Sequence, residues 1–182
     1  PRPGPPRPPP AARGRALAEW TRQARATAAP GAPEEGSAPG IGLTAARRAL
    51  VVSGTPVAVA RPYVATLAPV ANIAVGDETP WGVAAELAEL VPDTASGTYA
   101  EGATAADVLA AAGDRTIVAV VRDAHRHAWM AQAVAALISA RPDTVVVEMG
   151  LPRARPSGAF HVATHGAARV CGRAAAEIIA GA

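Results

Sequence analysis

The second half of the chain alternates short apolar runs with longer amphipathic segments. Residues 117–121 form a run of five apolar residues between the pair Arg115–Thr116 and Arg122, and DTVVVEMG (residues 143–150) repeats the pattern. Such runs are typical of parallel strands that are buried on both faces. The segment between them, HAWMAQAVAALISA, predicts a helix that ends before Pro142. Strands that alternate with helices predict a mostly parallel sheet with helices on both faces.

The alternation extends over residues 41–182, which we expect to form one α/β domain, a three-layer α/β/α sandwich. We expect Thr104 to cap one helix at its N-terminus and Pro80 to occupy the first helical position of another. Pro62 limits how central a strand at 63–67 can be, because proline donates no ladder hydrogen bond. The predicted strands are 49–54, 57–60, 63–67, 70–76, 117–121, 144–147 and a short one in GAFHVATHG; the predicted helices are 44–50 (or a turn), 79–90, 104–113, 127–141 and one over AARVCGRAAAEIIAGA.

Residues 1–40 are expected to lie outside this sandwich. Seven of the first ten residues are proline, which favours an extended polyproline II linker, although the PxxP spacing also fits an SH3-type ligand. Residues 15–28 (RALAEWTRQARATA) predict a short helix, and its Trp20 needs a surface to pack on. We therefore interpret residues 1–40 as a Pro-rich linker with a short docking helix.

Charge and composition exclude several classes of partner. Residues 1–40 carry six arginines against three acids, whereas residues 41–182 carry eleven against twelve. The predicted sandwich is therefore near neutral and poor in aromatic residues, so we expect no nucleic-acid partner.

No apolar run reaches the roughly 18 residues of a membrane span, and no signal peptide is visible, so localisation stays open between cytoplasm and secretion. The single Cys171 excludes an internal disulfide, and its small-residue context favours a core position over a catalytic thiol.

Polar and charged side chains follow three of the predicted strands. Ligands of open α/β sheets bind outside the carboxyl ends of the strands, so these residues are candidates to face a substrate or a partner domain. The candidates are Arg122, Asp123, His125, His127, Glu148, Arg153, Arg155, His161 and His165.

The spacing of these residues suggests their chemistry. Asp123 stands just before a helix, where we expect its carboxylate to cap free backbone N–H groups. His125 and His127 point to different sides of a helix, so we expect no metal site. Asp123 and Glu148 follow neighbouring strands, which leaves an acid–base pair open as an alternative. No GxGxxG motif follows a strand, so we expect no dinucleotide or other cofactor.

Four stretches resemble the C-terminal domain of bacterial glycoside hydrolase family 3 enzymes of the β-N-acetylhexosaminidase type. They are GLTAARRAL, VANIAVGDETPWG, VVRDAHRHAWM and TVVVEMGLPRARPSGAFHVATHGAARVCGRAAAEII. The resemblance covers about residues 40–182 and implies an α/β sandwich packed on a (β/α)₈ barrel that hydrolyses terminal N-acetylglucosamine with retention. The family's catalytic residues lie on the barrel, including a motif like KHFPGHGDT, which this sequence lacks. No position is therefore assigned a catalytic role, and the barrel would need roughly 250 further residues.

Three functions are compatible with these observations. The first is a C-terminal accessory domain of a family 3 glycoside hydrolase, inactive alone, with a barrel as its partner. The second is a stand-alone module that binds carbohydrates, such as N-acetylglucosamine-containing glycans, or another small molecule. The third is a small hydrolase that uses Asp123 and Glu148. A sandwich without its barrel exposes an apolar docking face, which predicts self-association or coverage by the Trp20 helix.

Overall fold

The computed structural model describes residues 40–69, 82–153 and 155–181. Six strands form one sheet in the order β1-β6-β5-β4-β2-β3. All neighbouring pairs are parallel except β1 and β6, which are antiparallel. The strands are β1 (Val51–Gly54), β2 (Pro62–Leu67), β3 (Ala95–Tyr99), β4 (Thr116–Val121), β5 (Val145–Glu148) and β6 (Phe160–Ala163). The helices are α2 (Ile41–Ala49), α3 (Ala84–Leu90), α4 (Ala105–Ala112), α5 (Ala128–Ala140), α6 (Arg169–Ala180) and the 3₁₀ turn η1 (Ala124–Arg126).

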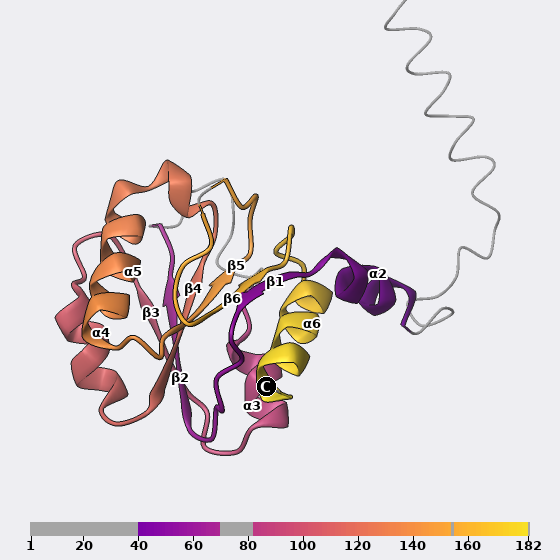
Figure 1. Ribbon diagram of the computed structural model, residues 1–182, viewed down its shortest axis with the longest axis horizontal. Coiled ribbons are helices and arrows are strands. Elements are labelled where there is room, and N and C mark those ends of the chain that lie inside the picture. Colours follow the sequence, from indigo (N-terminus) through magenta and orange to yellow (C-terminus); the bar gives the residue numbers. More distant parts are fainter. Residues whose placement is uncertain (1–39, 70–81, 154, 182) are drawn as a thin grey trace, which may run out of the picture. The chain divides into compact units, whose positions relative to one another are not determined.

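Helices cover both faces of the sheet, as Figure 1 shows. On one face α3 and α6 pack on the strands, and their Leu87 and Ile179 belong to the same buried cluster as Val118 of β4. On the other face α4 and α5 contribute Val108 and Leu137 to further buried clusters. The predicted three-layer α/β/α sandwich with a mostly parallel sheet is thus confirmed.

The buried strands follow directly from the apolar runs. Residues 117–121 of β4 are all buried, and successive side chains point to opposite faces of the sheet. Val118 and Val120 meet α3 and α6, whereas Ile117 and Ala119 meet α4 and α5. A strand that is covered on both sides has no polar position, which is why the run is continuous.

Two predicted helix ends, the start at Thr104 and the end before Pro142, agree with the structure. Thr104 caps α4: its hydroxyl accepts the N–H of Asp107 at 3.3 Å, and the Asp107 carboxylate accepts the N–H of Thr104 at 2.8 Å. The hydrogen bonds that the Asp107 carboxylate accepts from the backbone N–H and the hydroxyl of Thr104 hold the pKa of Asp107 below its usual value. Helix α5 ends at Ala140, two residues before Pro142. Cys171 of α6 is half-buried and packs against the core.

Several predicted elements differ from the structure. Strand β2 lies between β4 and β3, so the limit placed on it by Pro62 is wrong. Pro62 is the first residue of the strand, where a missing N–H is tolerated. Strand β3 has no predicted counterpart, because its half-exposed sequence ASGTY lacks an apolar run. Residues 57–60 form no strand, and α2 is a full helix from Ile41.

The start of α3 also differs from the prediction. The helix begins at Ala84, since Gly82 has a φ of 127°, which is incompatible with a right-handed helix. The predicted helix start at Thr79 and Pro80, the strand at 70–76 and the docking helix at 15–28 fall outside the described residues. Within the ranges that the structure describes, no helix is both long and apolar enough to cross a bilayer.

Candidate functional site

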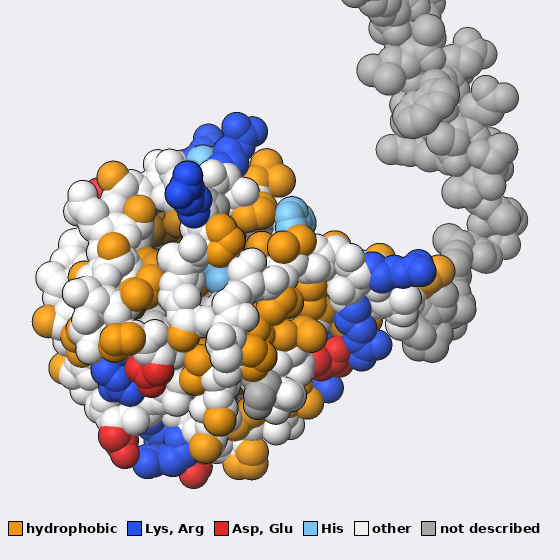
Figure 2. All heavy atoms as spheres, in the orientation of Figure 1, with side chains coloured by type: hydrophobic (Ala, Val, Ile, Leu, Met, Phe, Trp, Pro, Cys, Tyr) orange, Lys and Arg blue, Asp and Glu red, His pale blue; other side chains and the backbone are white. Residues whose placement is uncertain are grey.

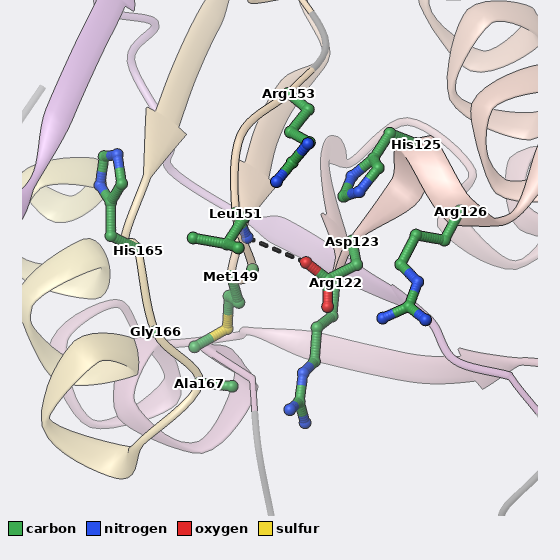
Figure 3. Close-up of a pocket in the computed structure, with 11 residues that line it drawn as sticks. Arg122, Asp123, His125, Arg126, Met149, Leu151, Arg153, His165, Gly166 and Ala167 are labelled. Carbon is green, nitrogen blue, oxygen red and sulfur yellow. Dashed lines mark hydrogen bonds between the residues drawn. The ribbon is translucent and has the colours of Figure 1, made fainter. Parts of the chain in front are cut away.

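A cavity of about 450 Å³ opens at the carboxyl ends of β4, β5 and β6. This is the edge at which open α/β sheets bind their ligands. Three loops supply its walls: the turn after β4, the segment after β5 and the turn before α6 (Figure 3). Its lining residues are Arg122, Asp123, His125, Arg126, Met149, Gly150, Leu151, Arg153, His165, Gly166 and Ala167.

Asp123 adopts an unusual backbone conformation in this cavity. Its φ is 53°, in the left-handed region, and its side chain makes no capping hydrogen bond to η1. Instead, Oδ1 accepts the backbone N–H of Leu151 at 2.9 Å, which ties the β4 turn to the segment after β5 (Figure 3). The predicted capping role of Asp123 is therefore wrong.

Glu148 takes the capping role instead. Its side chain is buried; Oε1 accepts the backbone N–H groups of Asp123 and Gly150, both at 2.8 Å, and Oε2 accepts that of Ala124 at 3.2 Å. The carboxylate of Glu148, at the end of the next strand, lies within hydrogen-bond reach of the N–H groups of Asp123 and Ala124 at the start of η1. Glu148 thus acts as the structural centre of the strand-end loops.

Gly150 completes this arrangement. A Cβ at this position would lie 2.3 Å from Asp123 Oδ1 and 2.6 Å from the Asp123 backbone nitrogen. Real Cβ atoms do not approach backbone so closely, so only glycine lets the β4 turn and the β5 segment meet here.

The structure divides the sequence-predicted site residues between two cavities. The strand-end cavity collects Arg122, Asp123, His125, Arg153 and His165, and Figure 3 shows His165 across the cavity from the residues of the β4 turn. Glu148, His161 and Arg155 line a second cavity, with His125 bordering both. His127 lines neither of them; it immediately precedes α5, where its carbonyl accepts the N–H of Met130.

Sequence reasoning missed part of the lining of the strand-end cavity. Arg126 lies in the same turn as the predicted residues and was identifiable from its charge and position. Leu151, Gly166 and Ala167 carry no chemical signal in the sequence, because small and apolar residues line a cavity only through the path of their loops.

The second cavity has a volume of about 380 Å³ and lies on the α5 face of the sheet. Apolar side chains of β4, β5 and α5 form most of its wall, including Val121, Val134 and Val146. His161 of β6 is buried at its edge, and burial lowers the pKa of the imidazole. A neutral imidazole is therefore favoured at this position.

His161 is expected to make the protein less stable in acid. Its folded pKa is lowered, so below the unfolded value of about 6.5 the unfolded chain binds a proton that the folded chain does not. The free energy of unfolding should then fall as the pH drops from 6.5 towards the folded pKa. Denaturant titrations between pH 7 and 5 should show a smaller decrease for His161→Met than for the wild type.

The matched control for this prediction is His127→Gln, which removes a histidine from outside both cavities. Three other ionisable residues face the same cavity as His161: Glu148, Arg155 and His125. Their contribution to the pH dependence is shared by both proteins, so the quantity to compare is the difference in unfolding free energy between His161→Met and the wild type at each pH. Parallel pH curves for wild type and His161→Met would contradict the assignment.

The described ranges contain no group of three or more His, Cys, Asp or Glu side chains with the spacing of a metal site. Both carboxylate oxygens of Glu148 and the Oδ1 of Asp123 accept backbone N–H groups. The available groups of the strand-end cavity are therefore its guanidinium and imidazole side chains and the second oxygen of Asp123.

The fold of the chain is similar to part of a solved glycoside hydrolase structure. The structure is similar to that of a glycoside hydrolase family 3 β-N-acetylglucosaminidase from Paenibacillus sp. str. FPU-7, with a TM-score of 0.66 and 17% sequence identity. The match covers 92% of this chain and 36% of that chain. The chain therefore shares the fold of part of that enzyme, as the resemblance implied, and spans about a third of the length of the enzyme.

Other comparisons add little to this result. Zn-bound CbsA from Thermotoga neapolitana matches with a TM-score of 0.45 and 17% identity, over 76% of this chain and 29% of that chain, which is too weak to support an argument. No family model and no curated protein matches the sequence.

Proposed function

We propose that the chain is a C-terminal accessory domain of a family 3 glycoside hydrolase of the β-N-acetylglucosaminidase type. The observation that carries the proposal is the fold match, which covers nearly all of this chain and only 36% of the enzyme. In this proposal the catalytic residues lie on a (β/α)₈ barrel partner, and the strand-end residues Arg122, Asp123, His125 and Arg153 face that partner or its substrate.

Exposed apolar residues support a docking role. Among the described residues, six large hydrophobic side chains are exposed, and four of them belong to β1 and α6: Val51, Val52, Val170 and Ile178. Hydrophobic side chains also gather over the region of β1, β6 and α6 in Figure 2. Such surface is typical of protein–protein contact, so we propose that it binds the barrel and, without it, a second copy of the chain.

The alternative of a small hydrolase is not favoured. Asp123 lines the strand-end cavity, whereas Glu148 lines the apolar cavity on the α5 face. A glycosidase pair needs both carboxyl groups on opposite sides of one bond. Both carboxylates here also accept backbone N–H groups, which suits a structural role.

A second candidate function is ligand binding by the chain itself. The cavity at the carboxyl ends of three neighbouring strands favours it, because that edge is the usual ligand site of such sheets. N-acetylglucosamine-containing glycans are the ligands suggested by the fold match. Backbone amide shifts of residues 122–127 during titration with N-acetylglucosamine would test this candidate.

Two measurements test the accessory-domain proposal. The purified chain should not hydrolyse 4-nitrophenyl N-acetyl-β-glucosaminide above the buffer rate. Mixed with a family 3 barrel produced without its own sandwich, it should form a complex in sedimentation velocity and raise the melting temperature of the barrel. Enzyme-like turnover by the chain alone, or failure to associate with the barrel, would overturn the proposal.

The apolar surface provides a matched pair of variants for the same experiment. Val51→Thr combined with Val52→Thr keeps the branched shape and removes apolar surface, so association should weaken. Ala110→Ser on α4 adds a hydroxyl at an exposed position on the opposite face and should leave association unchanged. Equal behaviour of the two variants would exclude the β1 surface as the docking site.

A further inference from the structure

The strand-end cavity has an unbalanced set of charges. Three arginines line it, Arg122, Arg126 and Arg153, together with two histidines, His125 and His165. The single acidic residue of its lining is Asp123, whose Oδ1 already accepts the N–H of Leu151. The formal charge of the lining is therefore positive even with both imidazoles neutral.

Five arginines elsewhere in the domain form ion pairs. Ion pairs within 4.0 Å join Arg47 to Glu177, Arg61 to Asp114 and Arg141 to Asp143. Arg169 and Arg173 bind Glu86 and Glu89 of α3. Among the described residues, no carboxylate lies within ion-pair distance of Arg48, Arg115 or Arg155, so pairing is common among these arginines but not general.

All three arginines of the strand-end cavity belong to the unpaired set. Among residues 40–69, 82–153 and 155–181, no carboxylate lies within ion-pair distance of Arg122, Arg126 or Arg153. Their guanidinium groups come from two separate loops around one concavity, rather than from one solvated helix face (Figure 3). Three unpaired guanidinium groups around a cavity raise its potential and favour an anion inside it.

We propose that the strand-end cavity binds a small ligand through an anionic group, either a carboxylate or a phosphate. Guanidinium groups recognise both with charge-assisted, often bidentate hydrogen bonds. The volume of about 450 Å³ suits a small molecule that carries such a group. The proposal specifies the ligand class for the ligand-binding candidate and rests on it, but it does not depend on a barrel partner.

The test is a titration of the ¹⁵N-labelled chain at constant ionic strength with four probes. Glucuronate supplies a carboxylate, N-acetylglucosamine 1-phosphate and inorganic phosphate supply a phosphate, and N-acetylglucosamine is the neutral control. We expect the anionic probes to shift the amides of residues 122–126, 150–153 and 165–167. The anion type that binds more tightly shows whether the natural ligand carries a carboxylate or a phosphate.

Arg153→Gln and Arg126→Gln should each lower the affinity for the more tightly bound anionic probe about tenfold, which is the effect of losing one charge-assisted hydrogen bond. Both side chains are exposed and outside the ion pairs above, so folding should be unaffected. The matched control is Arg61→Gln, the same charge change at the amino end of β2, where Arg61 pairs with Asp114. This control should leave affinity unchanged.

The outcomes separate the two proposals. Selective, Arg153-dependent binding of an anionic probe supports the inference. Equal or tighter binding of neutral N-acetylglucosamine would overturn it while leaving the ligand-binding candidate intact. Absence of shifts with every probe at millimolar concentration, or equal loss of affinity in Arg61→Gln, would overturn the inference as well. None of these results bears on association with a barrel.

Discussion

Replacing Glu148 with alanine is expected to lower the free energy of unfolding by about 3 kcal/mol, because it leaves three backbone N–H groups without their acceptor. The donors belong to Asp123, Ala124 and Gly150, so the variant should also loosen the walls of the strand-end cavity. Urea unfolding followed by circular dichroism measures the stability change, and amide hydrogen exchange of residues 122–126 measures the local effect.

Two further variants make this prediction specific. Glu148→Gln keeps one acceptor oxygen and should lose about half as much stability as the alanine variant. Glu101→Ala removes an exposed carboxylate at the start of a turn and should change stability by less than about 0.5 kcal/mol. A Glu148→Ala protein as stable as Glu101→Ala would contradict the structural role assigned to Glu148.

Replacing Gly172 with alanine is expected to destabilise the fold by about 2–3 kcal/mol, although alanine normally favours a helix. A Cβ at Gly172 of α6 would lie 2.1 Å from the carbonyl oxygen of Gly82, which precedes α3. Relief of that clash requires α6 and the start of α3 to move apart, and both helices pack on the same core cluster. Thermal and urea unfolding should both report the loss.

Gly42 provides the matched control, since it is also a helical glycine. The nearest atom to a Cβ at Gly42 is Val170 Cγ1 at 3.8 Å, an ordinary van der Waals contact. Gly42→Ala in α2 should therefore raise stability by up to about 1 kcal/mol through helix propensity. Changes of the same sign in the two variants would show that the close approach of Gly172 to Gly82 does not govern packing here.

Local chemistry made part of this fold predictable. The run at 117–121 and the segment before Pro142 indicated β4 and α5, and Thr104 indicated the start of α4. Each of these features depends on residues a few positions apart, so the sequence alone carries the information. The same holds for the location of the candidate site, because polar side chains after parallel strands meet at one edge of a sheet.

Features that depend on distant residues were not predictable. Strand β3 is held at the sheet edge by pairing with β2, and its Tyr99 hydroxyl lies 2.7 Å from that of Tyr63. Nothing in ASGTY itself demands a strand. The position of β2 between β4 and β3 likewise follows from the pairing of whole strands. Pro62 alone does not determine whether β2 lies inside the sheet or at its edge.

The sequence by itself determined the class of fold, the main buried strands and helices, and the sheet edge that gathers the polar residues. These features are readable from the sequence because a strand that is buried on both faces requires a continuous apolar run. Capping residues and prolines likewise influence a helix end within about one helical turn. Only the tertiary structure decided that Glu148 and not Asp123 caps the β4 turn, and that Asp123 and Glu148 face different cavities. Those outcomes depend on which backbone donors a neighbouring strand brings within hydrogen-bond reach, and that is a property of strand order and register.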